Sequence, residues 1–297
     1  MRKKKSPKDV AFHAINYALF GIFTLSCIYP FYYLFINTIS SNDLSAAGYI
    51  TFYPREIHFD NYVNVLKISG LAHAAYVSLY RTVVGTLLTV GASAFLGYLF
   101  TKKEMWLRRL WYRMLIVTMY FSAGLIPWYI TMNNLGLTNN YLAYVLPTII
   151  TPFNIILVKT FIEGIPPSLE ESAEIDGAGY TKIFRSIIVP LITPILATIT
   201  IFSAVNQWNS FIDTAFLMTD TKYYTLQFLL WRYLNESSSL AALIRNSQDM
   251  AASVQHMQTP GSVRMTVTMI VVLPILIIYP FFQRFFVKGI LIGAVKG

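Results

Sequence analysis

The sequence predicts an all-α membrane protein with six transmembrane helices. Apolar residues make up 55% of the 297 residues and charged residues only 12%. The mean hydropathy of +0.52 lies outside the range that is usual for soluble domains. Six apolar segments reach the ~20 residues that a helix needs to cross a bilayer. They are 11–36, 75–100, 110–132, 141–163, 187–209 and 264–286.

The first apolar segment follows a short basic stretch, Arg2 to Lys8. This arrangement resembles a signal peptide, but the run 11–36 is too long for a signal's apolar core and lacks a clear small-residue cleavage site. We therefore expect it to be retained as the first span. Cys27, the single cysteine, lies within this run, so an intramolecular disulfide is impossible and a buried thiol is expected.

Basic residues gather in the short connections, a distribution that suits membrane topology better than nucleic-acid binding. With six spans all of these groups fall on one face, whereas the opposite link, 132–141, has no charge. The groups are Arg2, Lys3, Lys4, Lys5 and Lys8; Lys102, Lys103, Arg108 and Arg109; Lys182 and Arg185; and Lys288 and Lys296. Because basic connections mark the cytoplasmic side, we expect both termini and the segment 166–190 to be cytoplasmic.

The two longer connections, 37–74 and 210–263, are then outside, and neither resembles a separate domain. Asp60 or Asn61 is expected to start a short helix, and two more are expected at 226–234 and 241–250. The predicted organisation is one membrane domain, 11–286. A cytoplasmic N-terminal segment, 1–10, precedes it and a cytoplasmic tail, 287–297, follows it.

A polar segment between two apolar runs, PPSLEESAEIDGAGYTKIFRSIIVPLITP, begins at Pro166. The two prolines should end the preceding helix, and Ser168 with Glu171 three residues later forms a capping-box pattern. Gly177 can adopt the left-handed conformation that stops a helix. The pattern predicts a short exposed helix, a glycine elbow and an amphipathic helix. An ordinary solvated loop is the alternative, but such closely specified geometry favours a surface offered to a partner.

Motifs for catalysis are missing from the sequence, so we predict that the chain is not an enzyme and has no catalytic residues. The four histidines are scattered and no HExxH or Cys/His spacing occurs, so we also predict no metal site. Neither GxSxG nor GxxxxGK[ST] is present. If ATP drives this protein, another chain hydrolyses it.

Polar residues within or beside the spans are candidates for a translocation path, because ionisable groups at membrane depth are costly and normally face protein, water or ligand. The candidates are Arg81 in the second span and, around the end of the fifth, Asn206, Gln207, Trp208, Asn209 and Asp213. The alternative is that Arg81 extends to the outer surface and Trp208 joins an interfacial aromatic belt.

Two motifs give the chain a specific resemblance. Glu171-Ser172-Ala173, then Asp176-Gly177-Ala178 and Ile188-Val189-Pro190-Leu191, resembles the EAA motif of ABC-importer permeases, with Ser172 in place of the first alanine. The ending, QRFFVKG followed by GAVKG, resembles that of the MalG-like subunit of the maltose-transporter family of carbohydrate-importer permeases, within it the subgroup for complex oligosaccharides.

This resemblance implies a type I ABC-importer permease in the bacterial cytoplasmic membrane. Its partners would be a second, homologous permease in a heterodimer, two ABC ATPase subunits, an extracytoplasmic solute-binding protein, lipid and a carbohydrate, and no nucleic acid. The ATPase, not this chain, would bind ATP and Mg. The coupling helix that contacts the ATPase would include Glu170, Glu171, Ser172, Ala173, Asp176, Gly177 and Ala178, and the tail Gly293, Ala294, Val295, Lys296 and Gly297 would make a second contact.

The sequence indicates the substrate less specifically than it indicates the family. Arg81, Arg232, Arg245 and Arg264 would suit an acidic, uronic-acid-containing oligosaccharide, because guanidinium pairs well with carboxylate. Two other functions stay open. One is a secondary transporter driven by an ion gradient, although no inverted repeat or paired mid-membrane carboxylate is evident. The other is an ABC permease for a non-sugar solute, which should lack the GAVKG ending.

Overall fold

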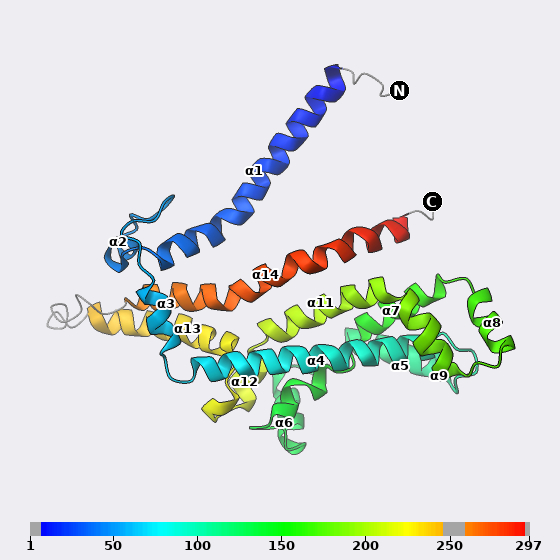
Figure 1. Cartoon of the computed structure of the whole chain (residues 1–297). Coiled ribbons are helices and arrows are strands. Elements are labelled where there is room, and N and C mark those ends of the chain that lie inside the picture. Colours follow the sequence, from blue (N-terminus) through cyan, green and yellow to red (C-terminus); the bar gives the residue numbers. More distant parts are fainter. Residues whose placement is uncertain (1–6, 246–258, 295–297) are drawn as a thin grey trace. The chain divides into compact units, whose positions relative to one another are not determined.

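The computed structural model describes residues 7–245 and 259–294, and every regular element within these two ranges is helical (Figure 1). The chain divides into two compact units. Unit 1 comprises residues 1–68 and 233–272, and unit 2 comprises residues 69–232 and 273–297. The all-α prediction is confirmed for the described residues, and the predicted domain bounds stay a prediction.

Unit 1 contains α1 (Pro7–Thr38), α2 (Asn42–Ala46) and α3 (Asp60–Leu66), with the end of α13 (Leu226–Arg245) and the start of α14 (Pro260–Ala294). Two buried asparagines hold the connection after α1. The Oδ1 of Asn37 accepts a hydrogen bond from Ser45 (2.6 Å), and the Nδ2 of Asn61 donates to the carbonyl of Thr38 (3.0 Å). Because buried polar groups need partners, these bonds fix the loop against the helix end.

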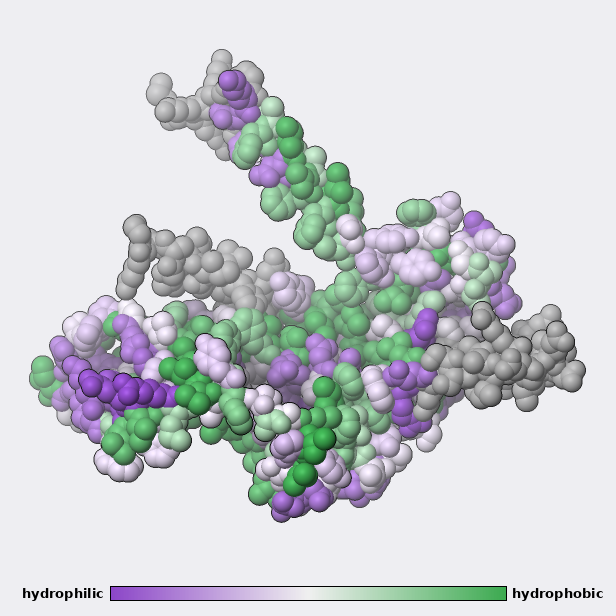
Figure 2. All heavy atoms as spheres, turned by 180° about the vertical axis from the view of Figure 1, so that it is seen from behind, coloured by the Kyte–Doolittle hydropathy of each residue, from purple (hydrophilic) through white to green (hydrophobic). Residues whose placement is uncertain are grey.

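Most of α1 is apolar and exposed, as Figure 2 shows by its green side chains. Cys27 is exposed on this helix, so the expectation of a buried thiol is wrong. The reason is that the side chains of this stretch of α1 meet few others within the described part of unit 1, and an apolar exposed face is what a membrane-spanning helix presents to lipid.

Unit 2 is built around α4 (Leu71–Leu99), which packs against α7 (Pro152–Glu163) and α11 (Thr193–Asn209). Gly97 allows a close approach of α4 to α7, because a Cβ there would lie 2.7 Å from Cγ1 of Val158 and 3.2 Å from the backbone nitrogen of Lys159. Small residues allow such close helix packing in membranes. The core beside this crossing contains Ala94, Tyr98, Val158, Ile162, Ile183, Ile188, Ile192 and Ile199.

Shorter elements complete unit 2. They are α5 (Arg108–Tyr120), α6 (Leu125–Asn134), η1 (Tyr141–Tyr144), η2 (Leu146–Thr148), α8 (Ser168–Ile175), α9 (Tyr180–Ile183), the π-helical turn η3 (Phe184–Ile188), α10 (Val189–Leu191), α12 (Ile212–Leu217) and η4 (Thr221–Tyr223).

Three helices within the described residues are long and apolar enough to cross a membrane: 8–38, 71–99 and 261–281. Two bent pairs bring the number to at most five, 141–148 with 152–163 (43°) and 180–191 with 193–209 (79°). The predicted span 110–132 is instead divided into α5 and α6, and Gly124, with φ of +86°, lies in the break. The six-span count therefore stays a prediction.

The connecting helices follow the sequence signals in part. The helix predicted at Asp60 is α3. The two helices predicted at 226–234 and 241–250 are instead one helix up to Arg245, α13, because no proline or glycine interrupts this stretch. Residues 246–250 lie outside the described residues.

Candidate functional site

The polar segment after Pro166 forms α8 and its flanking turns, but its N-terminus differs from the predicted capping box. Pro167 occupies the position before the helix with φ of −59°, and no side-chain capping bond forms. The carbonyl of Pro167 instead accepts from the amides of Glu170 (3.0 Å) and Glu171 (3.1 Å). Because proline already has a helical φ, the turn starts without the Ser168 hydroxyl.

The C-terminus of α8 forms the predicted glycine stop. Gly177 has φ of +77°, its amide bonds to the carbonyl of Glu174 (3.0 Å), and the amide of Ala178 bonds to the carbonyl of Ala173 (2.9 Å). This pair of bonds is the Schellman motif. Ala173 and Ala178 both pack on the core beside α4 and α7, so the glycine turn fixes one face of α8 against unit 2.

The opposite face of α8 carries exposed acidic side chains and one exposed apolar side chain. Glu171, Glu174 and Asp176 are exposed, and Ile175 is 86% exposed. Of the remaining predicted coupling residues, Ser172 is exposed and donates to the carbonyl of Ser168 (2.8 Å).

Glu170 does not share this exposed face. It is half-buried and forms an ion pair with Lys102, which follows the end of α4. The Lys102 ammonium also lies over the rings of Tyr98 (4.5 Å) and Tyr180 (5.8 Å). Burial is the largest single influence and disfavours the ammonium charge, but the hydrogen bonds and the charge interactions with Glu170 and Tyr98 together outweigh it and raise the pKa of Lys102. Lys102 therefore stays charged at neutral pH, and its ion pair with Glu170 joins α8 to α4.

Arg81 forms a buried network in unit 2. Its side chain is 1% exposed. Its guanidinium donates to both carboxylate oxygens of Asp213 (3.0 and 2.6 Å), to Oε1 of Gln207 (3.1 and 3.2 Å) and to the carbonyl of Ser210 (3.2 Å). It also lies 4.5 Å above the ring of Tyr144. Such bidentate pairing is the strong form of ion pair.

Gln207 extends this network to the broken span 141–163. Its amide nitrogen donates to Oγ1 of Thr148 (2.7 Å) and to the carbonyl of Tyr144 (3.3 Å). Gly85 on α4 makes room for it, because a Cβ at that position would lie 2.5 Å from Nε2 of Gln207. The network therefore ties α4, α11 and the η1–η2 segment together.

The six predicted path residues therefore lie in different environments. Arg81, Gln207 and Asp213 form one network, so the alternative that Arg81 extends to the membrane surface is wrong. Asn206 is exposed and lines a cavity. Trp208 is half-buried and Asn209 is exposed, and neither lines that cavity.

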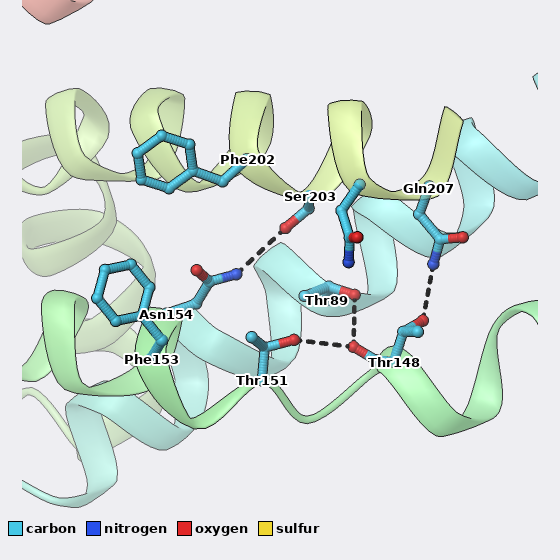
Figure 3. A pocket seen from close by; sticks show the side chains of 9 residues that line it. Thr89, Thr148, Thr151, Phe153, Asn154, Phe202, Ser203 and Gln207 are labelled. Carbon is cyan, nitrogen blue, oxygen red and sulfur yellow. Dashed lines mark hydrogen bonds between the residues drawn. The ribbon is translucent and has the colours of Figure 1, made fainter. Parts of the chain in front are cut away.

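The cavity lies among α4, α11, η2 and the first turn of α7, and has a volume of about 270 Å³ (Figure 3). Its lining carries no charged side chain and consists of Thr89, Thr148, Thr151, Phe153, Asn154, Phe202, Ser203, Asn206 and Gln207. A second cavity, of about 290 Å³, lies beside it and shares Thr148. Sequence reasoning missed the α7 contribution; the signal that could have indicated it is the proline-interrupted span PTIITPFN.

The predicted tail contact falls at the edge of the described chain. Gly293 and Ala294 belong to the last turn of α14. Val295, Lys296 and Gly297 lie outside the described residues. Within the part of the chain that the structure describes, no group of three His, Cys, Asp or Glu side chains is placed to hold a metal ion.

Comparison with known proteins decides the family. Residues 89–292 match the profile of the family described as "Binding-protein-dependent transport system inner membrane component". The chain belongs to this family. The matched part of the permease begins in α4 and includes α8, the cavity, Gln207 and Asp213, so most of the geometry above lies in the segment that defines the family.

Two relatives resemble the permease along nearly its whole length. It is 31% identical to the polygalacturonan/rhamnogalacturonan transport system permease protein YtcP of Bacillus subtilis, over 98% of this chain and 100% of that protein. It is 26% identical to the arabinooligosaccharides transport system permease protein AraQ of Halalkalibacterium halodurans, over 100% of both chains.

A solved structure shares the fold. It is the crystal structure of a bacterial ABC transporter involved in the import of the acidic polysaccharide alginate. Its matching chain is 28% identical, with a TM-score of 0.84 over 95% of this chain and 99% of that chain. The resemblance to ABC-importer permeases of the carbohydrate type is therefore confirmed, and the permease is a transport component rather than a catalytic subunit.

Proposed function

We propose that the permease is one of two homologous membrane subunits of an ABC importer that carries an oligosaccharide into the cytoplasm. The observation that carries this proposal is the 31% identity to the polygalacturonan/rhamnogalacturonan permease along 98% of the chain. Because that protein, the arabinooligosaccharide permease and the alginate importer are all described as carrying carbohydrate chains, an oligosaccharide is the substrate class, and an acidic one is included.

In this proposal α8 is the coupling helix that contacts a separate ABC ATPase, which binds ATP and Mg. Two observations support the orientation of α8. Ala173 and Ala178 pack against unit 2, whereas Glu171, Glu174 and Ile175 are exposed on the rest of the helix. An exposed apolar side chain among acidic ones suits a partner's groove better than solvent. Both termini and α8 are then cytoplasmic, and the solute-binding protein docks on the opposite side.

The role of Glu170 differs from that expected from the sequence. It pairs with Lys102 rather than extending from the exposed face. We assign it to holding α8 on α4, so that closure of the ATPase subunits around ATP moves α4 together with α8. The membrane subunits then exchange between two states, and the exchange requires only that ATP bind one state more tightly.

Substitutions in α8 test this coupling role. Gly177→Pro is incompatible with φ of +77°, and Glu171→Lys reverses the charge of the exposed face. We expect both variants to insert and to bind the ATPase, yet to lose uptake driven by ATP in proteoliposomes. Glu104→Lys, an exposed acidic residue outside α8, is the matched control. Normal uptake by both α8 variants at wild-type expression would contradict the coupling role.

The tail is proposed as a second ATPase contact on the basis of the GAVKG ending alone. Deleting Gly293 to Gly297 should weaken the association of the ATPase, which a pull-down in detergent measures. An unchanged yield of ATPase would remove the tail from the interface.

One experiment separates the proposed importer from the other transport classes. Uptake of labelled sugars into proteoliposomes should require ATP, the ATPase and the solute-binding protein together. Uptake driven by an ion gradient alone would contradict the proposal. Uptake of an amino acid or phosphate, with no binding of sugars by the solute-binding protein, would keep the ABC class and replace the substrate.

A further inference from the structure

The cavity beside α7 differs from the Arg81 network in one respect. Part of its polar lining has hydrogen-bonding atoms that bind no other described residue. Thr89 and Thr151 both donate to the carbonyl of Thr148 (3.0 and 3.1 Å). The amide nitrogen of Gln207 donates to Thr148 and Tyr144, and its oxygen accepts from Arg81. These side chains form a wall whose hydrogen-bonding capacity is largely satisfied, as the dashed lines in Figure 3 show for those drawn.

Three polar side chains retain capacity for a ligand. Asn154 donates through Nδ2 to the Ser203 hydroxyl (3.2 Å). Its Oδ1 makes no hydrogen bond to the described residues, and the Ser203 hydroxyl can still donate its own hydrogen. Asn206 is exposed, and its side chain makes no hydrogen bond within the described part of the chain. The cavity therefore offers both donors and acceptors, all of them neutral.

Two phenyl rings lie beside these groups. Phe153 and Phe202 are 49% and 44% exposed, and their ring centroids are 6.5 Å apart. Aromatic faces bind apolar C–H surfaces. A ligand that has a C–H face and a rim of hydroxyl groups matches rings and amides together, and a pyranose or furanose ring has both.

Charge and size narrow the ligand further. The lining contains no cation. Arg81, which donates to the lining residue Gln207, has its guanidinium saturated by Asp213, Gln207 and Ser210. A carboxylate would meet no counter-charge there. The volume of about 270 Å³ is below the ~300–1,000 Å³ of sites for drug-sized ligands. The cavity therefore suits one ring of a longer chain.

The backbone conformation beside the cavity also supports a substrate contact. Residues 149–151, between η2 and α7, are non-helical, and non-helical backbone at membrane depth is tolerated where protein buries it or where it lines a cavity. In secondary transporters, substrate sites form at such discontinuous helices.

We propose that this cavity is a sugar subsite that holds one neutral, hydroxyl-bearing ring of the oligosaccharide during its passage, through Phe153, Asn154 and Asn206. The inference rests on the proposed function. It assigns a direct substrate contact to this subunit, and it separates the neutral-ring contact from any contact with a carboxylate.

Cysteine protection in the complete importer tests the subsite. Because Cys27 is the single cysteine, a Cys27→Ser background leaves Asn206→Cys as the one thiol of this chain. Its alkylation by a maleimide during turnover is measured with arabinotriose or stachyose as neutral probes and trigalacturonate as the acidic probe. Uptake of the same probes by the parent importer is measured in parallel. The expected result is slower labelling with a transported neutral probe and no change with trigalacturonate.

Substitutions provide a second readout. Phe153→Ala should lower uptake of the neutral probes about three- to ten-fold, and Asn206→Ala about two- to ten-fold. Phe216→Ala and Asn134→Ala are the matched controls, because both residues are similarly exposed and lie outside the cavity.

The outcomes are distinguishable. Protection by trigalacturonate equal to that by neutral probes, or uptake of trigalacturonate alone, overturns the neutral-ring assignment. Uptake of neutral probes with neither protection nor an effect of the substitutions overturns the subsite and leaves the importer proposal standing. Uptake of no sugar by the parent importer overturns the proposed function and the subsite with it.

Discussion

The two ends of α4 are held by charged groups in different ways. Near one end the Arg81 guanidinium has three hydrogen-bonding partners, on α11, on the turn after it and in the first turn of α12, and is almost fully buried. Beyond the other end Lys102 has one carboxylate partner, Glu170 of α8, and two tyrosine rings. The first arrangement is a redundant network, and the second is a single ion pair.

This difference indicates at which end of α4 a contact can be lost with a small loss of folding free energy. Removing one partner from a buried ion pair leaves an uncompensated charge, which costs several kcal/mol. An ion pair that is partly accessible contributes about 1 kcal/mol or less. The Arg81 end should therefore depend strongly on each of its partners, whereas the Lys102 pair can join α8 to α4 during transport without contributing much to the stability of the fold.

The largest effect is expected at Asp213. Asp213→Ala leaves the Arg81 charge buried and should destabilise the permease by about 3–5 kcal/mol, measured by denaturant unfolding in detergent. Asp220→Ala is the control, because Asp220 forms an exposed pair with Lys222 (3.0 Å), and it should change stability by less than about 1 kcal/mol. Equal losses from the two variants would contradict the contrast between a buried network and a surface pair.

Substitution of Gly97 should have an effect on stability intermediate between those at Asp213 and Lys102. The methyl group of Gly97→Ala would meet Val158 at 2.7 Å, and such overpacking costs about 1–3 kcal/mol. Gly91→Ala on the same helix has open space around its Cβ and should be neutral or slightly stabilising. The comparison of the two unfolding curves checks this, and identical curves would show that the α4–α7 crossing is looser than the structure indicates.

The smallest effect on stability is expected at Lys102. Lys102→Ala should cost at most about 1 kcal/mol and still reduce the uptake obtained per ATP hydrolysed. Lys103→Ala, on the exposed neighbour, should leave that ratio unchanged. Restoration of the ratio by the exchange Lys102→Glu with Glu170→Lys would identify the ion pair as the cause, whereas an unaltered ratio in Lys102→Ala would exclude it from coupling.

The pH dependence of this link follows from the raised pKa of Lys102. A raised pKa in the folded state gives a contribution that is complete below the ordinary lysine pKa of 10.5 and is lost only as pH rises through the higher value. Through this pair, coupling should therefore not vary between about pH 6 and 9.

Features that depend on local chemistry can be predicted from the sequence. Gly177 was predicted as the elbow because few other residues adopt φ of +77°. The expectation that Ser168 caps α8 is wrong. Pro167 precedes the helix with a helical φ, so the first turn forms without a side-chain cap. The family motif predicted a coupling segment here, but it could not show that Glu170 is half-buried against Lys102 while Glu171 is exposed.

Contacts between distant residues could not be predicted in this way. The sequence indicates Arg81 and Asp213 separately as path candidates, whereas their pairing across 132 positions is a property of the fold. The Lys102–Glu170 pair spans 68 positions and has no sequence signal. The role of Asn154 depends on the break before α7, which the hydropathy of the span conceals.

Between Arg81 and Lys102 the chain carries no charged residue, and α4 continues from Arg81 to Leu99, 18 helical steps that correspond to about 27 Å. This length is close to the thickness of the hydrocarbon layer of a typical bilayer, about 30 Å. Lipids with longer or shorter acyl chains impose a mismatch of a fraction of a kcal/mol per Å. The Lys102 pair would yield to that mismatch before the Arg81 network does. Acyl-chain length alone should therefore bias the engagement of α8.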